Sequence, residues 1–237
     1  MLNKEKIISF LEKEKLKNVN ILNFLENNEF IDAHQIGDSI LAKAKSDNVW
    51  IYFSISDKEE FLRLLELLNE DDKYFATVEE WMIPYLTTKN LVEWDLKTYQ
   101  YYLPEDIDLP IPCAEFRELQ ISDAEYVYEN SDYKEFLSID YIQDRIEKGI
   151  SSGMIINDQL SAWAITQDDG AIGFLHVTNE HRRNGYAYQI MLDMISKVRG
   201  AGKIPITYIE EGNHKSIQLM KKLGFIEDRQ LIWLKLA

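Results

Sequence analysis

The chain has 237 residues, of which 46% are hydrophobic and 28% charged, so it is an ordinary soluble globular protein with room for one large or two small domains. Its net charge of −15 argues against a general nucleic-acid surface, which needs clustered lysine and arginine. The single cysteine, Cys113, excludes an internal disulfide and a cysteine-based zinc cluster, and it fits a reducing cytoplasm. No apolar run approaches the roughly 18 residues that a membrane span needs, and the charged N-terminus is not a secretory signal. We therefore expect a cytoplasmic protein that binds neither nucleic acid nor membrane.

The N-terminal half alternates helical and strand patterns. In chain order, apolar spacing and turn residues predict helices over Asn3–Glu14 and Leu16–Leu25, an extended segment over Ala33–Ser39, strands over Ile40–Lys45 and Asn48–Ile55, a helix over Lys58–Leu68, a strand over Tyr74–Val78, a helix over Glu79–Leu86 and a strand over Leu91–Leu103. Tyr99, Tyr101 and Tyr102 on the last strand could line a substrate groove, although such a run more often serves strand packing.

A linker follows this strand. Residues 104–112 hold three prolines and three acidic residues, a composition that cannot form a regular element. The sequence thus predicts an N-terminal α/β domain over residues 1–103 and a second domain over residues 113–237.

The second half reads as a further α/β unit. The predicted elements are a strand over Phe116–Gln120, a helix from Ser122, a helical region over Tyr133–Gly149, strands over Met154–Asn157, Leu160–Thr166 and Ala171–Thr178, a helix after Ala187 that ends near Gly200 or Gly202, a strand over Ile204–Ile209, a helix over Asn213–Leu223 and a last strand over Phe225–Ala237. We expect a mixed sheet of about six or seven strands with flanking helices.

The turn between Val177 and the following helix is suited to binding an anion. It contains His181, Arg182 and Arg183, and Gly185 then lets the backbone approach a ligand closely. The first turn of a helix carries unpaired N–H groups and the positive end of the helix dipole. The segment therefore predicts a phosphate or pyrophosphate site, although a solvated turn that carries two arginines is the simpler alternative.

Two motifs in this half resemble the GNAT acyltransferases. Arg182, Gly185 and Ala187 fit the Q/R-x-x-G-x-G/A motif with which that family grips the pyrophosphate of acyl-coenzyme A, and a strand ends at Val177 just before it. The family's closing pattern N-x-x-(A/S)-x-x-L-x-x-K-x-G-F is matched by Asn213, Ser216, Leu219, Lys222, Gly224 and Phe225. The resemblance implies acetyl-CoA or another acyl-CoA as co-substrate. The residues that it implies for acyl-CoA binding are Leu175, His176, Val177, Arg182, Arg183, Asn184, Gly185, Tyr186, Ala187, Asn213, Ser216 and Lys222.

The order of elements is similar to that of the glycine N-acyltransferase-like branch, which has a motif-poor first half. By this resemblance, residues 1–103 are a degenerate, non-catalytic GNAT-like domain; an unrelated α/β cap is the alternative. In the family, backbone N–H groups near Val177 would face the thioester carbonyl while the acceptor amine attacks it directly.

The sequence departs from the family at the proton-transfer positions. Met220 stands where many members carry a tyrosine general acid, and Ala171 where several carry a glutamate base. The candidate substitutes are His176, Tyr208 and Glu210, each of which also fits a packing or solvated role. Asp168 and Asp169 could reach the site as well, but acids are ordinary turn residues.

The sequence therefore predicts an N-acyltransferase, with acetyl-CoA as donor and a small amine or amino acid as acceptor. The acidic surface slightly favours a cationic acceptor. The alternative is a non-catalytic acyl-CoA-binding sensor or regulatory protein, which Met220 and Ala171 favour. The sequence leaves the acyl chain length and the oligomeric state open.

Overall fold

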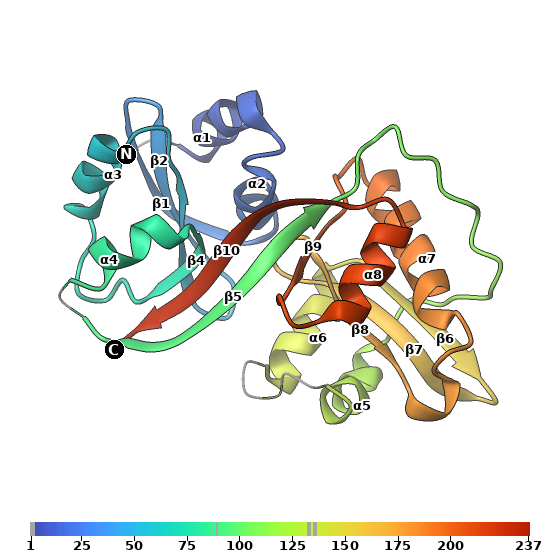
Figure 1. Cartoon of the computed structure of the whole chain (residues 1–237). Coiled ribbons are helices and arrows are strands. Elements are labelled where there is room, and N and C mark those ends of the chain that lie inside the picture. Colours follow the sequence, from blue (N-terminus) through green and yellow to red (C-terminus); the bar gives the residue numbers. More distant parts are fainter. Residues whose placement is uncertain (1–2, 89, 132–133, 135–136) are drawn as a thin grey trace. The chain divides into compact units, whose positions relative to one another are not determined.

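The polypeptide passes twice between two compact units. The computed structural model describes residues 3–88, 90–131, 134 and 137–237. The N-terminal unit comprises Met1–Gln100 with Asp228–Ala237, and the C-terminal unit comprises Tyr101–Glu227 (Figure 1). The C-terminal unit differs from the predicted domain over residues 113–237 at both ends. It includes residues 104–112, and the last strand returns to the first unit, where Ile232 pairs with Val78 and Leu234 with Phe75.

The N-terminal unit is a mixed sheet between two layers of helices. Its strands lie in the order β1-β2-β3-β4-β10-β5, and β3 and β4 are parallel. The elements are α1 (Lys4–Leu11), a 3-10 turn (Glu12–Glu14), α2 (Val19–Asn27), β1 (Glu29–Ile36), β2 (Ser39–Lys45), β3 (Val49–Ser54), α3 (Lys58–Leu65), β4 (Tyr74–Val78), a 3-10 turn (Glu80–Met82), α4 (Ile83–Leu86), β5 (Val92–Tyr102) and β10 (Ile226–Leu236).

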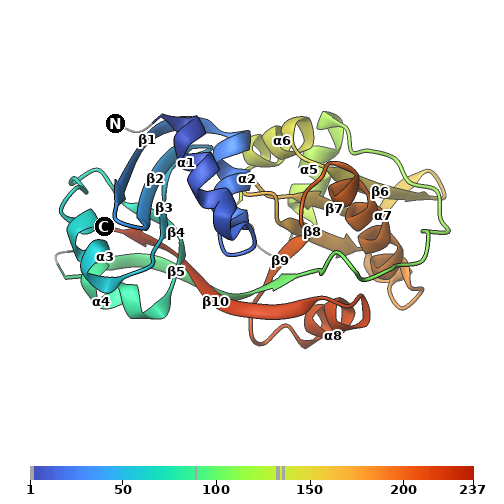
Figure 2. The same ribbon diagram turned by 90° about the horizontal axis from the view of Figure 1, so that it is seen from above.

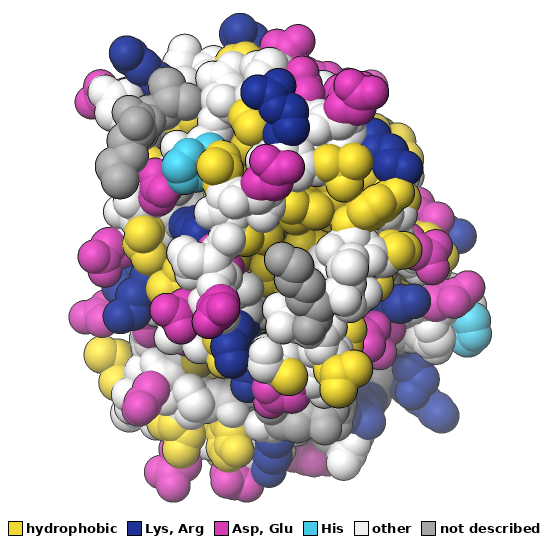
Figure 3. All heavy atoms as spheres, turned by 90° about the vertical axis from the view of Figure 1, so that its left-hand side faces the viewer, with side chains coloured by type: hydrophobic (Ala, Val, Ile, Leu, Met, Phe, Trp, Pro, Cys, Tyr) yellow, Lys and Arg dark blue, Asp and Glu magenta, His cyan; other side chains and the backbone are white. Residues whose placement is uncertain are grey.

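Alternation along the strands divides the core of this unit in two. Ala42 and Tyr52 pack with residues of α1 and α2, whereas Leu41, Ile51 and Phe53 pack with residues of α3 and α4. Figure 2 shows these two pairs of helices on opposite faces of the sheet. Figure 3 shows one face of the molecule, on which lysine and arginine side chains are scattered among acidic ones and do not gather into a broad patch. In the part of the chain that the structure describes, no helix is both long and apolar enough to span a bilayer.

The C-terminal unit has a three-stranded antiparallel sheet, β6-β7-β8, with helices on both faces. Its elements are a 3-10 turn (Ile121–Asp123), α5 (Ala124–Glu129), α6 (Ile139–Lys148), β6 (Ser151–Ile156), β7 (Gln159–Thr166), β8 (Ile172–Val177), a 3-10 turn (Asn179–His181), α7 (Tyr186–Gly200), β9 (Ile206–Ile209) and α8 (His214–Lys222). Trp163 and Ile165 pack against α5 and α6, and α7 covers the opposite face (Figure 1). The mixed α/β architecture predicted from the sequence is confirmed.

The C-terminal unit differs from the sequence predictions at two places. The prediction of a strand over Phe116–Gln120 is wrong. Arg117 forms only an isolated bridge with Gly153, and the Leu119 N–H donates to the Ser151 hydroxyl at 3.0 Å, so the backbone pairing with β6 does not continue. The prediction that all strands of this half form one sheet is also wrong, because β9 is not part of the β6-β7-β8 sheet. The helical region Tyr133–Gly149 yields α6, while residues 132–133 and 135–136 lie outside the described residues.

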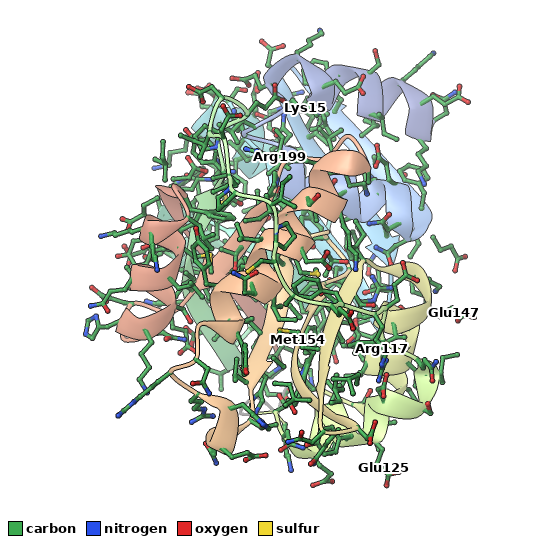
Figure 4. The ribbon with its side chains drawn as sticks, turned by 90° about the vertical axis from the view of Figure 1, so that its right-hand side faces the viewer. Lys15, Arg117, Glu125, Glu147, Met154 and Arg199 are labelled. Carbon is green, nitrogen blue, oxygen red and sulfur yellow. The ribbon has the colours of Figure 1, made fainter. Side chains whose placement is uncertain are left out.

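The predicted linker is held against α7. Arg199, labelled in Figure 4, donates from its guanidinium to the carbonyls of Pro104 and Ile107 at 2.6 and 2.8 Å. The Cys113 N–H donates to the Gln189 side chain at 2.8 Å. These contacts explain why residues 104–112 belong to the C-terminal unit although they form no regular element.

Candidate functional site

The strand β8 is irregular in its middle. Ile165 pairs with Gly173 and Trp163 with His176, so one residue of β7 opposes two of β8. Phe174 takes a positive φ of 53° at this bulge, an uncommon conformation for a bulky residue. The bulge re-aims the second half of β8, and the His176 ring stacks on Trp163 with 4.6 Å between the centroids.

One edge of β8 pairs with β7, and its other edge faces β9. β8 and β9 are in contact but do not belong to the same sheet. The two strands lie side by side at the start of β8, where the Thr207 hydroxyl donates to the Ile172 carbonyl at 2.8 Å. The Thr178 N–H donates to Ser161 of β7 at 2.9 Å. Because ladder bonds alternate along an antiparallel strand, the backbone N–H and C=O of Val177 point away from β7. A backbone donor is thus aimed at the β9 side of the strand.

The turn after β8 leaves open space beside the start of α7. The Arg182 Nε donates to the Val177 carbonyl at 3.0 Å, which ties the turn to the end of the strand. Gly185 precedes α7 with a φ of +81°, and no heavy atom lies within 4 Å of the place where a Cβ would stand. No side chain caps α7, and its first turn holds no acidic residue. The first N–H groups of α7 and the exposed Arg182 and Arg183 therefore surround space that a phosphate could fill.

The neighbouring side chains of the turn support its shape. Asn184 donates from Nδ2 to the His181 carbonyl at 3.2 Å, and the rings of His181 and Tyr186 lie 6.2 Å apart. The His181 Nδ1 lies 2.9 Å from the Thr178 hydroxyl. Asn184 and Tyr186 thus have a packing role whether or not a ligand binds.

The closing motif forms helix α8 beside α7. Asn213 caps α8 by accepting the Ser216 N–H on its Oδ1 at 3.2 Å, so this asparagine has a structural role of its own. The Lys222 ammonium lies 4.6 Å from the centre of the Tyr188 ring of α7. The contact brings one end of the closing motif against the first turns of α7.

The positions that lack the family's proton-transfer groups are buried. Met220 is 2% exposed and Ala171 is fully buried, so both are packing residues. Glu210 is half-buried at the end of β9, and its carbonyl accepts the Asn213 N–H at 2.9 Å. Of the candidate substitutes, Tyr208 has the most specific environment, because its hydroxyl donates to Asp169 Oδ2 at 2.6 Å.

Asp169 is the residue that sequence reasoning undervalued. It lies in the turn before β8 and is 1% exposed, and its Oδ1 accepts the Ala171 N–H at 3.1 Å. Burial, together with the charge of Asp168, raises the pKa of Asp169 to about 7, against the opposing effect of the Tyr208 and Ala171 hydrogen bonds. In the sequence, Asp168 and Asp169 before Gly170 indicate only a turn. The burial of Asp169 could not be predicted from them, because it depends on β9, which lies far along the sequence.

Comparisons with known proteins agree with this fold. Residues 149–234 match the model of the family described as FR47-like protein. No curated protein matches the sequence. A Drosophila protein of solved structure is similar over 100% of this chain and 97% of its own, with a TM-score of 0.78 and 18% identity.

Two solved structures carry GNAT names. A GCN5-related N-acetyltransferase from Kribbella flavida is 12% identical, with a TM-score of 0.58 over 93% of this chain and 94% of its own. A tandem GNAT protein from the clavulanic acid biosynthesis pathway is 15% identical, with a TM-score of 0.54 over 92% and 87%. The chain thus has the fold of the GNAT acyltransferases, as its motifs predicted, and residues 149–234 match the FR47-like family within it.

Proposed function

We propose that the protein is an acyl-CoA-dependent N-acyltransferase that transfers an acetyl group to the amine of a small molecule or amino acid. The observation that carries this proposal is the start of α7, where a left-handed glycine, open space and two exposed arginines meet uncapped N–H groups. That arrangement suits a pyrophosphate, which is one of the anionic groups of coenzyme A.

The geometry of β8 supports the same reaction. In the proposed complex the acyl-CoA lies along the edge of β8 that faces β9, and the Val177 N–H donates to the thioester carbonyl. This donor would stabilise the negative charge that develops on the carbonyl oxygen as the amine attacks. The new C–N bond forms as the C–S bond breaks, and the proton lost by the amine balances the proton gained by the thiolate. Asn213 and Ser216 would lie near the pantetheine arm.

The N-terminal unit is proposed to be a GNAT-like half that lacks a coenzyme site. It repeats the order of elements of the other half: two helices, three antiparallel strands, a helix, a strand, a helix and a long strand. The similarity to a tandem GNAT protein supports this proposal. We keep an unrelated α/β cap as the alternative.

A non-catalytic acyl-CoA sensor is the second candidate function. The burial of Met220 and Ala171 favours it, because neither residue can transfer a proton. Binding of acyl-CoA without transfer to any acceptor on a broad amine panel would support the sensor over the enzyme.

Calorimetric titration with acetyl-CoA tests the proposal. We expect micromolar binding by the wild type and its loss in Gly185→Glu, which puts a carboxylate where the pyrophosphate would lie. Gly202→Glu is the matched control, because Gly202 also has a positive φ, of 72°, and open space around its Cβ position, at the other end of α7. Equal weakening by both substitutions would point to backbone strain, and no binding of acetyl-CoA or of longer acyl-CoAs by the wild type would refute the proposal.

A further inference from the structure

The buried carboxyl of Asp169 stands out among the titratable groups of the C-terminal unit. Asp169 is 1% exposed, the lowest value of any aspartate or glutamate among the described residues, and a charge there has little water to solvate it. Turn chemistry needs only its Oδ1, which accepts the Ala171 N–H. Its second oxygen is used by Tyr208, which comes from β9 and is 39 residues further along the chain.

The hydrogen bond between Tyr208 and Asp169 is short. The 2.6 Å between the hydroxyl and Oδ2 is typical of an O–H donor to an ionised carboxylate. Tyr208 itself is half-buried, so it connects the enclosed carboxyl with the less enclosed side of β9. A proton that reaches the Tyr208 oxygen can therefore continue to Asp169 although no ligand can touch Asp169 directly.

In the proposed reaction the acceptor amine would approach past this pair. Thr207, the residue before Tyr208, is bonded to the carbonyl of Ile172 at the start of β8, and the Val177 donor stands at the end of that strand. The start of β8 is thus the end remote from the pyrophosphate turn. An acceptor that enters from this end would meet Tyr208 before it meets the thioester.

We propose that Tyr208 and Asp169 form the proton-accepting pair of the acyl transfer, in place of the family groups that Ala171 and Met220 have replaced. The inference rests on the proposed function. As the ammonium of the acceptor loses a proton to the Tyr208 oxygen, directly or through one water, the Tyr208 proton passes to Asp169. The neutral amine then attacks the thioester and the C–S bond breaks. The second proton that the amine nitrogen loses goes to the departing thiolate, and the proton stored on Asp169 leaves through Tyr208 to solvent.

The charges around the pair fit a group that changes its protonation state. Asp168 in the same turn and the hydroxyl of Tyr208 on β9 act directly on the Asp169 carboxyl, and the pKa of that carboxyl, raised to about 7 by burial and by Asp168, suits a base that works near neutrality. Arg145 of α6 is 1% exposed, and against the effect of this burial the negative charge of Asp168 raises the pKa of its guanidinium. Arg145 also donates to Asp144 and lies near Tyr141.

The test compares three variants for coenzyme binding, for the maximal rate of thiol release from acetyl-CoA with a saturating amine acceptor, and for the pH dependence of that rate. Asp169→Asn keeps the shape and the Ala171 hydrogen bond but cannot accept a proton, so we expect normal acetyl-CoA binding and roughly a hundredfold lower kcat. Tyr208→Phe should lower kcat similarly. Asp168→Asn should keep the plateau rate while the acidic limb of its pH profile moves to lower pH, since it removes the neighbouring negative charge.

The outcomes separate the inference from the proposed function. Wild-type acyl transfer with unchanged kcat and pH profile in Asp169→Asn would overturn the proton-accepting pair and leave the acyltransferase standing. A pair that only fastens the turn to β9 would lower thermal stability in Tyr208→Phe and would leave the acidic limb of Asp168→Asn in place. Binding of acetyl-CoA by the wild type without transfer to any amine would overturn both.

Discussion

Two strand–turn–helix segments of the molecule, β3 into α3 and β8 into α7, have the same order of elements but differ in the charge at the start of the helix. In the N-terminal unit Asp57 accepts the N–H groups of Glu59 and Glu60 at 2.8 and 3.2 Å, so an acidic side chain fills the start of α3. In the C-terminal unit Gly185 occupies the corresponding place and leaves the start of α7 uncapped. One helix start repels an anion and the other is suited to bind one.

The strands before these helices differ in whether their edge is paired with the next strand along the chain. β3 pairs with β4 in parallel register, with Ile51 opposite Phe75, so their shared edge is closed by backbone hydrogen bonds. β8 carries the bulge at Phe174 and belongs to a different sheet from β9. A similar order of elements therefore does not by itself predict a coenzyme site. In the proposed function, the uncapped helix start and the separation of β8 from β9 distinguish the C-terminal unit.

The largest effect on acetyl-CoA affinity is expected from removing the cation at one of these two helix starts. Arg182→Ala removes a guanidinium from the proposed pyrophosphate site and the tie to the Val177 carbonyl. A hydrogen bond to a charged group contributes about 1.5–3 kcal/mol, so we expect acetyl-CoA binding to weaken roughly ten- to a hundredfold in calorimetry.

Lys58→Ala is the matched control for this substitution. Lys58 is the first residue of α3, and its ammonium lies 4.9 Å from the centre of the Tyr85 ring. Acetyl-CoA affinity should stay at the wild-type value in this variant. If Lys58→Ala weakened binding as much as Arg182→Ala, the assignment of the coenzyme to the C-terminal unit would fail.

Local sequence chemistry was enough to predict the turn and the helices on either side of it. Arginine, glycine and helical periodicity between Arg182 and Val198 act within a few residues of one another, and α7 forms over Tyr186–Gly200 as expected. Asn213 as the start of α8 and Gly224 after its end follow from the same short-range rules.

Features that depend on distant partners could not be predicted in this way. The return of Asp228–Ala237 to the first unit depends on pairing with β4, and the failure of Phe116–Gln120 to form a strand depends on Ser151. The bulge at Phe174 had no sequence signal, since a bulky residue with positive φ is held there by its surroundings.

A smaller effect distinguishes the turns before β3 and β8. Asp169 is buried and its pKa is raised to about 7, whereas an unfolded aspartate titrates near 4. The folded state therefore binds more protons between these values, and its stabilisation by the protonated carboxyl is lost as pH rises through about 7. We expect the unfolding midpoint of Asp169→Asn, relative to wild type, to increase from pH 5 to pH 8 in denaturant titrations.

Asp47→Asn controls for the loss of a turn carboxylate. Asp47 lies in the turn before β3, is exposed, and accepts the N–H groups of Asn48 and Trp50 at 2.8 and 2.9 Å. The pH-dependent gain should be confined to Asp169→Asn. A gain of the same size in both variants would mean that net charge, and not burial, controls the stability of the protein in this range.

The smallest effect compares the two helix caps, Asp57 of α3 and Asn213 of α8. Each substitution by alanine removes one side-chain cap, so each should lower the free energy of unfolding by about 1 kcal/mol. Only Asn213→Ala should also weaken acetyl-CoA binding, because Asn213 is proposed to lie near the pantetheine arm as well as to cap its helix. Equal losses of stability with unchanged affinity in both variants would assign Asn213 to capping alone and restrict the proposed coenzyme site to β8 and the start of α7.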